Sequence, residues 1–252
     1  MDDIEAKIIT NRNIVKDYFL LRLRLARPLG TVVPGQFVML KIPGNTVFLR
    51  RPFSIYDYKR DVMSIMYKVK GSGTLALSNA VKGDSTMVLG PLGRGFNIYN
   101  KPNHIVVAGG IGIAGVHLLI KKIKANAHVF YGCTDEKELL LLNDLKMQDK
   151  YISTIDGSYG YKGNVIDLFR TRLKDYNARD TQVYACGPEG MLKGLKHALE
   201  SHRAPCQVLV EERMACGLGL CFGCVKKTLD EKEPYKRVCK EGPVFNLWQI
   251  CL

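Results

Sequence analysis

Four cysteines lie close together near the C-terminal end of the sequence, at Cys216, Cys221, Cys224 and Cys239. They read C-x4-C-x2-C-x14-C, and the first two intervals match the plant-type pattern in which four thiolates bind a 2Fe–2S cluster. Three glycines among them free the backbone to turn N–H groups towards the sulfur atoms. The spacing predicts a 2Fe–2S cluster; the alternatives are a structural zinc ion and a chance clustering of buried cysteines.

A second set of residues suits a phosphorylated cofactor. The segment Arg51-Pro-Phe-Ser54 is expected on a strand, and the segment Gly71-Ser-Gly-Thr74 is expected to open a short helix. A guanidinium pairs with pyrophosphate at two points, and a helix N-terminus offers free N–H groups to an anion. Together the two segments predict a phosphate clamp, with Ser54 able to reach a flavin ring edge. Singly, each is also typical of an ordinary strand or turn.

A third set indicates a dinucleotide site. The apolar run 105–108 leads into the glycine turn Gly109-Gly-Ile-Gly112 and then into a helical pattern, an arrangement that presents a helix N-terminus to pyrophosphate. The segment Cys186-Gly-Pro188 follows another strand-like run and is expected at the same sheet edge. Because the spacing departs from G-x-G-x-x-G, an ordinary β–α turn is the alternative. Cys186 either lines the nicotinamide pocket or is a small buried apolar residue.

Two acidic residues bear on the choice of nucleotide. Asp135 and Glu136 follow the second strand-like run of this region. Carboxylates at that place accept hydrogen bonds from ribose hydroxyls and repel a 2′-phosphate, which favours NAD over NADP. The same residues would serve equally well as caps of a helix N-terminus.

These residues must be positioned by regular secondary structure. The period of the hydrophobic residues changes along the chain, which indicates two kinds of domain. Up to about residue 100, short β-rich runs separated by turn residues cover 18–25, 36–42, 53–58, 62–69 and 86–89. Further on, strand-like runs at 104–108, 128–131, 151–155, 182–185 and 207–210 alternate with helical stretches near 114–125, 163–173 and 189–202. We therefore expect an α+β multi-domain protein: an antiparallel β-barrel domain (1–100), a doubly wound parallel α/β domain (101–210) and a small iron–sulfur lobe (211–252).

Composition sets outer limits on these assignments. The chain has 252 residues, 46% hydrophobic and 24% charged, as in an ordinary folded protein, with a formal net charge of +13. Its start lacks a secretory signal and no run predicts a membrane span, so we expect a cytoplasmic protein whose eight cysteines form no disulfide framework. No nucleophile–histidine–acid arrangement stands out, and no stripe of interleaved aromatic and basic residues indicates nucleic-acid binding.

Taken in order, these motifs resemble the ferredoxin–NADP reductase superfamily across essentially the whole chain. More narrowly, segments 212–224 and 238–245 look like those of electron-transfer subunits of type B dihydroorotate dehydrogenase. The resemblance implies FAD, a 2Fe–2S cluster held by the four cysteines, and NAD. It implies that FAD is bound by Arg51, Pro52, Phe53, Ser54, Met66, Tyr67, Lys68, Gly73 and Thr74. The residues predicted above to bind the nicotinamide nucleotide are Gly109, Gly110, Gly112, Cys186, Gly187 and Pro188.

The same resemblance implies a function. Electrons would run from dihydroorotate through the FMN of a separate catalytic subunit, then the cluster and FAD of this chain, to NAD+ in pyrimidine biosynthesis, with the subunits forming a heterotetramer. Ser54 would be the catalytic residue through a hydrogen bond near flavin N5, and hydride transfer between rings needs no general acid or base. The alternatives are a reductase subunit of a hydrogenase, sulfide or oxygenase system, and a zinc-stabilised protein that binds nucleic acid through its basic surface.

Two residues depart from the superfamily pattern. Phe53 replaces a common tyrosine, so stacking on the flavin remains but a hydroxyl hydrogen bond is absent. Gly115 replaces a common proline, which is expected to loosen the turn before the helix. Neither change removes a phosphate ligand.

Overall fold

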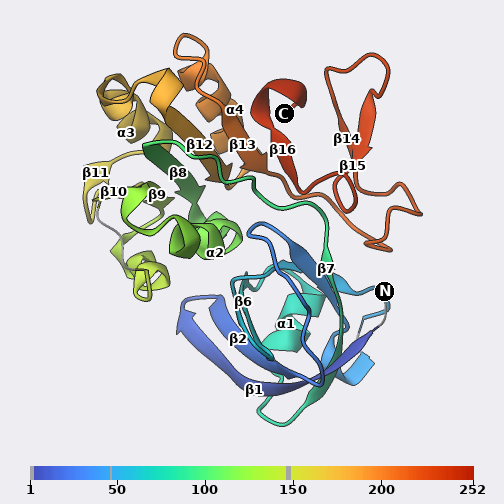
Figure 1. The fold of residues 1–252 in the computed structure, drawn as a ribbon. Coiled ribbons are helices and arrows are strands. Elements are labelled where there is room, and N and C mark those ends of the chain that lie inside the picture. Colours follow the sequence, from blue (N-terminus) through green and yellow to red (C-terminus); the bar gives the residue numbers. More distant parts are fainter. Residues whose placement is uncertain (1–2, 46, 146–148) are drawn as a thin grey trace.

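An antiparallel sheet of seven strands forms the N-terminal part of the protein (Figure 1). The computed structural model describes residues 3–45, 47–145 and 149–252. The strands, in the spatial order β4-β3-β7-β1-β2-β6-β5, are β1 (Ile4–Val15), β2 (Tyr18–Leu25), β3 (Phe37–Leu40), β4 (Arg51–Ser54), β5 (Asp57–Lys59), β6 (Val62–Lys68) and β7 (Ser85–Leu92).

The strands of this sheet alternate buried apolar and exposed polar side chains, so one face of the sheet is apolar. Closing the sheet into a barrel buries that face. In β2, Leu21, Leu23 and Leu25 are buried and the two arginines between them are exposed. The two sides of the barrel meet where β4 contacts β6. The short helix α1 (Ser72–Ser78) adds Leu77 to the same core. This is the predicted antiparallel barrel.

The second part is a mostly parallel sheet with helices on its faces (Figure 1). Its strand order is β11-β10-β9-β8-β12-β13-β16. The strands from β8 to β11 are added towards one edge of the sheet, and those from β12 onwards are added towards the other edge, as in a doubly wound fold. The parallel strands are β8 (Asn103–Gly109), β9 (Ala127–Cys133), β10 (Asp149–Thr154), β11 (Tyr161–Lys162), β12 (Thr181–Cys186) and β13 (Cys206–Leu209). The helices are α2 (Ile113–Ile123), α3 (Val165–Arg172) and α4 (Glu189–Leu199).

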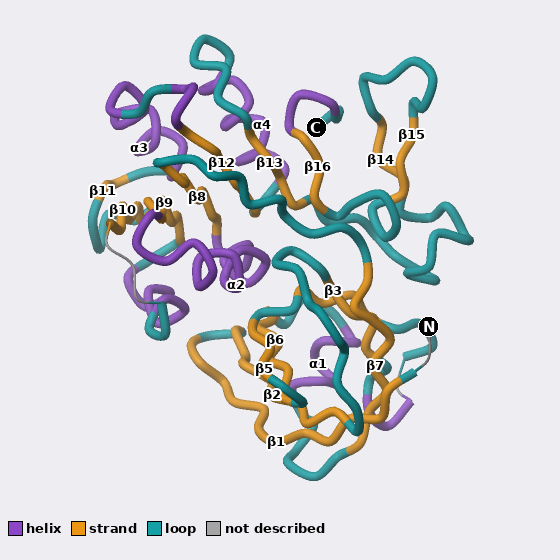
Figure 2. The backbone as a smooth tube through the Cα atoms, in the orientation of Figure 1, coloured by secondary structure: helices purple, strands orange, loops and turns teal. Residues whose placement is uncertain are grey.

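The C-terminal lobe has little regular structure of its own, and Figure 2 shows mostly loop there. Its two-stranded sheet consists of β14 (Val225–Lys227) and β15 (Tyr235–Arg237). The chain then returns as β16 (Val244–Asn246), which pairs antiparallel with β13. The segment predicted as a separate lobe from 211 onwards therefore supplies a strand to the α/β sheet.

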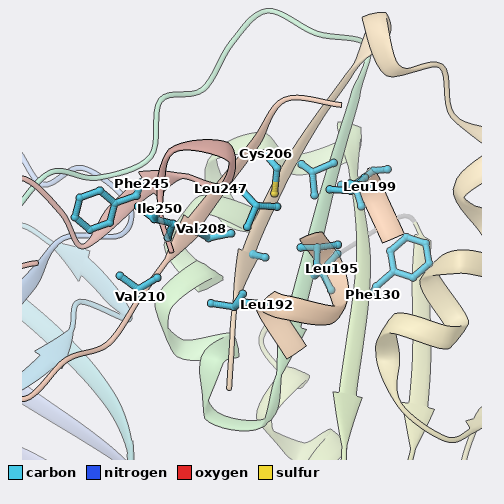
Figure 3. Packing of buried hydrophobic residues seen from close by; sticks show 14 of the residues in the cluster. Phe130, Leu192, Leu195, Leu199, Cys206, Val208, Val210, Phe245, Leu247 and Ile250 are labelled. Atoms are coloured by element: carbon cyan, nitrogen blue, oxygen red, sulfur yellow. The ribbon is translucent and has the colours of Figure 1, made fainter. Parts of the chain in front are cut away.

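One buried core runs through all three parts. Figure 3 shows Leu192, Leu195 and Leu199 of α4 packed beside β13, with Cys206 and Val208 nearby. The C-terminal segment adds Phe245, Leu247 and Ile250 to this cluster, and the barrel adds Phe37 and Met39. The parts are thus held together by shared apolar burial as well as by the chain.

The barrel and α2 are also joined by a polar contact. His117, fully buried on α2, stacks on Tyr56 with ring centroids 3.6 Å apart, and its Nδ1 lies 2.8 Å from the Tyr56 carbonyl oxygen. Asp144 closes the group: its carboxylate lies 2.9 Å from His117 Nε2 and accepts the Tyr56 hydroxyl at 2.7 Å. This His117 cluster fixes the angle at which the two larger parts meet.

The predicted fold class is confirmed, with differences in detail. The predicted run 53–58 is divided between β4 and β5, because the chain bends between Ser54 and Asp57. The strand β1 was not among the predicted runs, since its outer half carries several exposed or half-buried polar residues. In the described ranges, every helix is too short or too polar to cross a membrane.

Replacing Asp144 by Asn should lower the free energy of unfolding by about 1–3 kcal/mol, because the buried His117 ring loses a charged partner. Burial opposes ionisation, but His117 and Tyr56 hold the pKa of Asp144 below its usual value of 3.8. A carboxylate with a lowered pKa stabilises the fold above its unfolded-state pKa and stops doing so as the pH falls through the folded-state pKa. Denaturant titrations should therefore show the full difference at neutral pH and none in strong acid.

Asp149→Asn is the matched control. Asp149 pairs with His128 at the same 2.9 Å distance, but His128 is partly exposed, at 23%, whereas His117 is fully buried, so this change should cost less than about 1 kcal/mol. Equal losses in the two variants would contradict the role given to the His117 cluster.

Candidate functional site

The two predicted phosphate-binding segments meet in the barrel. A Cβ atom added to Gly73, in the first turn of α1, would lie 2.8 Å from Nε of Arg51, so the guanidinium rests against the start of that helix. Thr74 closes the turn before it, since its Oγ1 accepts the Lys70 and Gly71 N–H groups at 2.8 and 3.1 Å. A cation and a tight turn at a helix start thus stand together, which fits an anionic group.

The neighbouring strand β6 carries three residues that are predicted to bind the flavin, and their side chains lie on opposite faces of the strand. Tyr67 points into the barrel, where it stacks on Phe19 at 5.5 Å, and its hydroxyl donates to Asn11 at 3.1 Å. Burial raises the pKa of Tyr67 to about 12, so the hydroxyl remains a donor. Met66 and Lys68 point the other way, Met66 into the core shared with the α/β part and Lys68 to a large cavity.

Ser54 lies where β4, α2 and β12 meet. A Cβ atom added to Gly115 would stand 3.6 Å from Ser54 Oγ and 2.9 Å from Cys186 Sγ. Gly115 was expected to loosen the turn before the helix, but it lies within α2 and is buried. Its missing side chain instead lets the end of β4 approach the end of β12, which brings the serine of one part next to the cysteine of the other.

The large cavity, about 670 Å³, opens at the carboxyl ends of β8, β9 and β12, where a doubly wound sheet binds its ligands. Five of the predicted nucleotide-binding residues line it: Gly109, Gly110, Gly112, Gly187 and Pro188. The sixth, Cys186, does not. Its thiol is buried beneath α2, and burial raises its pKa well above the usual value. Cys186 is therefore a neutral apolar residue that packs outside the cavity lining.

The glycine turn is packed directly on the neighbouring strand end. A Cβ atom added to Gly112 would lie 2.2 Å from the carbonyl oxygen of Cys186, so any side chain there would displace main chain. The glycine is required by this close approach. The distance also explains why the turn between Gly109 and Gly112 keeps its shape without the usual spacing.

Several cavity residues were missed by sequence reasoning. The barrel contributes Tyr18 and Lys70, and the α/β part contributes Glu138 and Arg170. Glu138 is a buried carboxylate that accepts the Tyr18 hydroxyl at 3.3 Å and lies 3.4 Å from Lys16 Nζ. Because its partners lie about 120 positions away in the sequence, no local pattern points to it.

Asp135 and Glu136 do not line the cavity, although the adjacent Thr134 does. Asp135 caps the 3-10 helix Glu136–Leu142 by accepting the Lys137 N–H at 3.1 Å, and it forms an ion pair with Lys16 at 2.6 Å. The lysine holds the pKa of Asp135 below its usual value. The capping alternative is therefore the one observed.

The four predicted metal ligands lie in two segments, the loop 216–224 and the turn around Cys239. N–H groups are directed at three of the sulfur atoms: Leu218 to Cys216 at 3.3 Å, Gly223 to Cys221 at 3.4 Å, and Cys239 to Cys224 at 3.4 Å. Although burial opposes ionisation, the backbone N–H groups of Leu218, Cys221 and Leu220 and the Cys221 thiol lower the pKa of Cys216 to about 6. Gly217 and Gly219 have positive φ angles, which the loop needs in order to turn its N–H groups inward.

The thiols are arranged as two pairs. Cys216 interacts with Cys221, and Cys224 interacts with Cys239. Across 3–45, 47–145 and 149–252, no group of three or more His, Cys, Asp or Glu side chains could hold a metal ion as placed. Two thiol pairs with N–H donors suit a cluster in which four thiolates are shared between two irons, so these residues fit the group.

The barrel and the α/β domain, with a clamp in one and a glycine-lined cavity in the other, are arranged as in the ferredoxin–NADP reductase class. A solved structure of an NADH-dependent reduced ferredoxin–NADP oxidoreductase aligns with a TM-score of 0.85 at 25% identity, covering 98% of this chain and 89% of that one. The expected fold and reductase class are thus confirmed.

The cysteine lobe narrows the assignment from the reductase class to one family within it. Residues 211–251 match the iron–sulfur cluster binding domain of dihydroorotate dehydrogenase B, and residues 106–197 match the oxidoreductase NAD-binding domain. The electron transfer subunit of dihydroorotate dehydrogenase B (NAD(+)) from Caldanaerobacter subterraneus subsp. tengcongensis is 36% identical over 244 residues, 96% of each chain. That of Clostridium acetobutylicum is 38% identical over 216 residues, 85% of this chain and 84% of its own. The chain belongs to this family of electron transfer subunits.

Replacing Gly112 by Ala should weaken binding of NADH by at least about tenfold, because the new methyl group must push the glycine turn away from Cys186. Isothermal titration of the purified protein would measure the change. Flavin content, read from the visible spectrum, should stay at the wild-type level, because Gly112 does not belong to the barrel. Unchanged NADH affinity would show that the turn does not touch the nucleotide.

Proposed function

We propose that this protein is the electron-transfer subunit of a dihydroorotate dehydrogenase complex and passes electrons to NAD+ in pyrimidine biosynthesis. The observation that carries the proposal is the joining, in one chain, of a reductase fold with a loop whose N–H groups point at cluster-type cysteines. Membership of the family supports it. The cofactors of this function are FAD, a 2Fe–2S cluster and NAD.

In this proposal the barrel binds FAD. Arg51 and the turn at Gly73 and Thr74 hold its pyrophosphate, and the main chain of β6 follows its edge. Phe53 is buried in the barrel core edge-on to Tyr67, with ring centroids 5.8 Å apart, so it supports the site from behind. When bound, FAD exchanges a hydride with nicotinamide and single electrons with the iron–sulfur cluster. The protein supplies orientation and a dry site.

At the nucleotide end, the cavity receives the dinucleotide with its pyrophosphate on the glycine turn before α2. Ser54 stands at the junction of the two domains and donates a hydrogen bond near flavin N5. Cys186, neutral and buried under α2, packs behind this site and does not line the cavity. No side chain acts as a general acid or base.

The cluster is held by Cys216, Cys221, Cys224 and Cys239. An exposed apolar surface surrounds it: Leu218, Leu220 and Phe222 are 42%, 76% and 60% exposed, and Cys221 is exposed beside them. Apolar side chains at such exposure favour burial against another protein. We assign this surface, the cysteine-loop surface, to the FMN-containing catalytic subunit of a heterotetramer.

We place the complex in the cytoplasm. The eight cysteines form no disulfide in this structure, which suits a reducing compartment. Fractionation of cells with an antibody against the chain would test the location.

The first experiment is an anaerobic visible spectrum of the purified protein, with iron and flavin assayed before and after NADH is added. One FAD and two irons per chain, both bleached by NADH, are expected from a 2Fe–2S flavoprotein. Cys216→Ser should lose iron and keep FAD, which NADH still reduces, because the barrel and cavity are intact. A colourless, zinc-loaded wild type would contradict the proposal.

Leu220→Glu should weaken association with the catalytic subunit at least about tenfold, because a charge replaces an apolar contact at the interface. Val81, 62% exposed on the barrel, supplies the control: Val81→Glu should leave association unchanged. Co-purification and analytical ultracentrifugation of the two subunits measure both. If Leu220→Glu binds normally, the catalytic subunit docks elsewhere, and if only another redox protein is bound, the reductase belongs to a different system.

A further inference from the structure

Arg237 connects the parts of the cysteine lobe. From the end of β15, its Nη1–H donates to the carbonyl oxygen of Gly219 at 2.9 Å, and its guanidinium lies 4.9 Å from the ring centroid of Phe222. Its other edge forms a two-point ion pair with Glu241, at 3.0 Å from Nε and 2.5 Å from Nη2. One side chain therefore reaches both the loop that carries three cysteines and the turn that carries the fourth.

The main chain around Arg237 also connects the turn that carries Cys239 to the loop that carries the other three cysteines. Its carbonyl oxygen accepts N–H groups from residues 240–242 at 2.9 to 3.3 Å, which forms the turn around Cys239. The next residue, Val238, donates its N–H to the carbonyl oxygen of Cys224 at 2.9 Å. The residue directly after β15 is thus hydrogen-bonded to Cys224, and this contact holds Cys224 and Cys239 next to each other.

Arg237 brings a positive charge into the cysteine lobe, where it interacts with the Cys239 and Cys224 thiols, and Glu241 brings the negative charge that pairs with it. Both side chains are only about a quarter exposed, at 22% and 24%. Charges in such a setting are less screened than those on an open surface. The net charge and hydrogen bonds around an iron–sulfur cluster set its reduction potential. One-electron reduction adds a negative charge, so a nearby cation favours the reduced form and a nearby carboxylate opposes it.

We propose that Arg237 is a positioning residue of the iron–sulfur site, whose charge raises the reduction potential of the cluster and whose contacts hold the loop 216–224 against the turn of Cys239. Glu241 orients the guanidinium and offsets part of its charge. The inference rests on the proposed function, because it requires a cluster at the four cysteines.

The test is a potentiometric titration of the full chain, with the reduced cluster followed by electron paramagnetic resonance. Arg237→Gln should make the cluster harder to reduce, and Glu241→Gln should make it easier. We expect each change to alter the equilibrium constant for reduction by about threefold to tenfold, where tenfold corresponds to 59 mV for a one-electron couple. A residue that only stabilised the fold would not produce shifts of opposite sign.

Two further variants separate charge from geometry. Arg237→Lys keeps the charge and loses the two-point pair, so its potential should stay close to wild type while iron is lost faster to a chelator. Arg172→Gln is the control: Arg172 also has an ion pair, with Asp175 at 3.6 Å, and an aromatic neighbour, Tyr151 at 5.5 Å, but it belongs to α3. It should change neither quantity.

Shifts in the same direction, or none, in Arg237→Gln and Glu241→Gln with full iron content would overturn the role given to Arg237. If Arg237→Gln does not retain iron, the Glu241→Gln variant is the test, because an unchanged reduction potential in Glu241→Gln would also overturn the role given to Arg237. A wild-type chain without the resonance of a reduced cluster would instead overturn the proposed function.

Discussion

The attachment of the C-terminal segment to both larger domains is the constraint on which the rest of the structure depends. The Arg94 N–H donates to the Gly242 carbonyl oxygen at 2.5 Å, and β16 begins to pair with β13 two residues later. At the other end of the lobe, Gly217 packs so closely on Met39 of the barrel that an added Cβ atom would lie 2.5 Å from its side chain. The cysteine loop therefore has a fixed place relative to both the clamp and the cavity. In electron transfer between bound cofactors, a fixed separation is the property a scaffold has to provide.

The cysteines of this chain show how environment decides the behaviour of one chemical group. Cys186 is enclosed by α2 and Leu209, no hydrogen-bond donor among the described residues is directed at it, and burial keeps its thiol protonated. Cys216 is also partly desolvated, yet backbone N–H groups favour its thiolate. The first environment suits a thiol to apolar packing, and the second suits a thiol to ligation. The difference comes from the local backbone, because the glycines of the loop can direct N–H groups inward and the regular strand β12 cannot.

The parts of the site that depend on neighbours in the sequence could be predicted from it. The glycine turn and the cysteine loop are each formed by a few consecutive residues, the clamp is formed by two such short segments, and the change from barrel to α/β domain follows from the hydrophobic period. Contacts across the domain boundary could not be predicted. Glu138 meets Lys16 and Tyr18 only because the barrel packs on the α/β domain, and Lys16 turns Asp135 away from the cavity. Gly115 was misjudged for the same reason, since its neighbours Ser54 and Cys186 belong to other elements.

The pairing of β16 with β13 has a consequence for the way this chain can be divided. A sheet edge with free N–H and carbonyl groups is a template for another strand, and proteins cover such edges to avoid aggregation. In this protein the cover comes from the last residues of the chain, beyond the cysteines. The iron–sulfur lobe is therefore no detachable module. A chain ended after β13 would expose the unpaired N–H and carbonyl groups of that strand and should aggregate more readily than the whole chain.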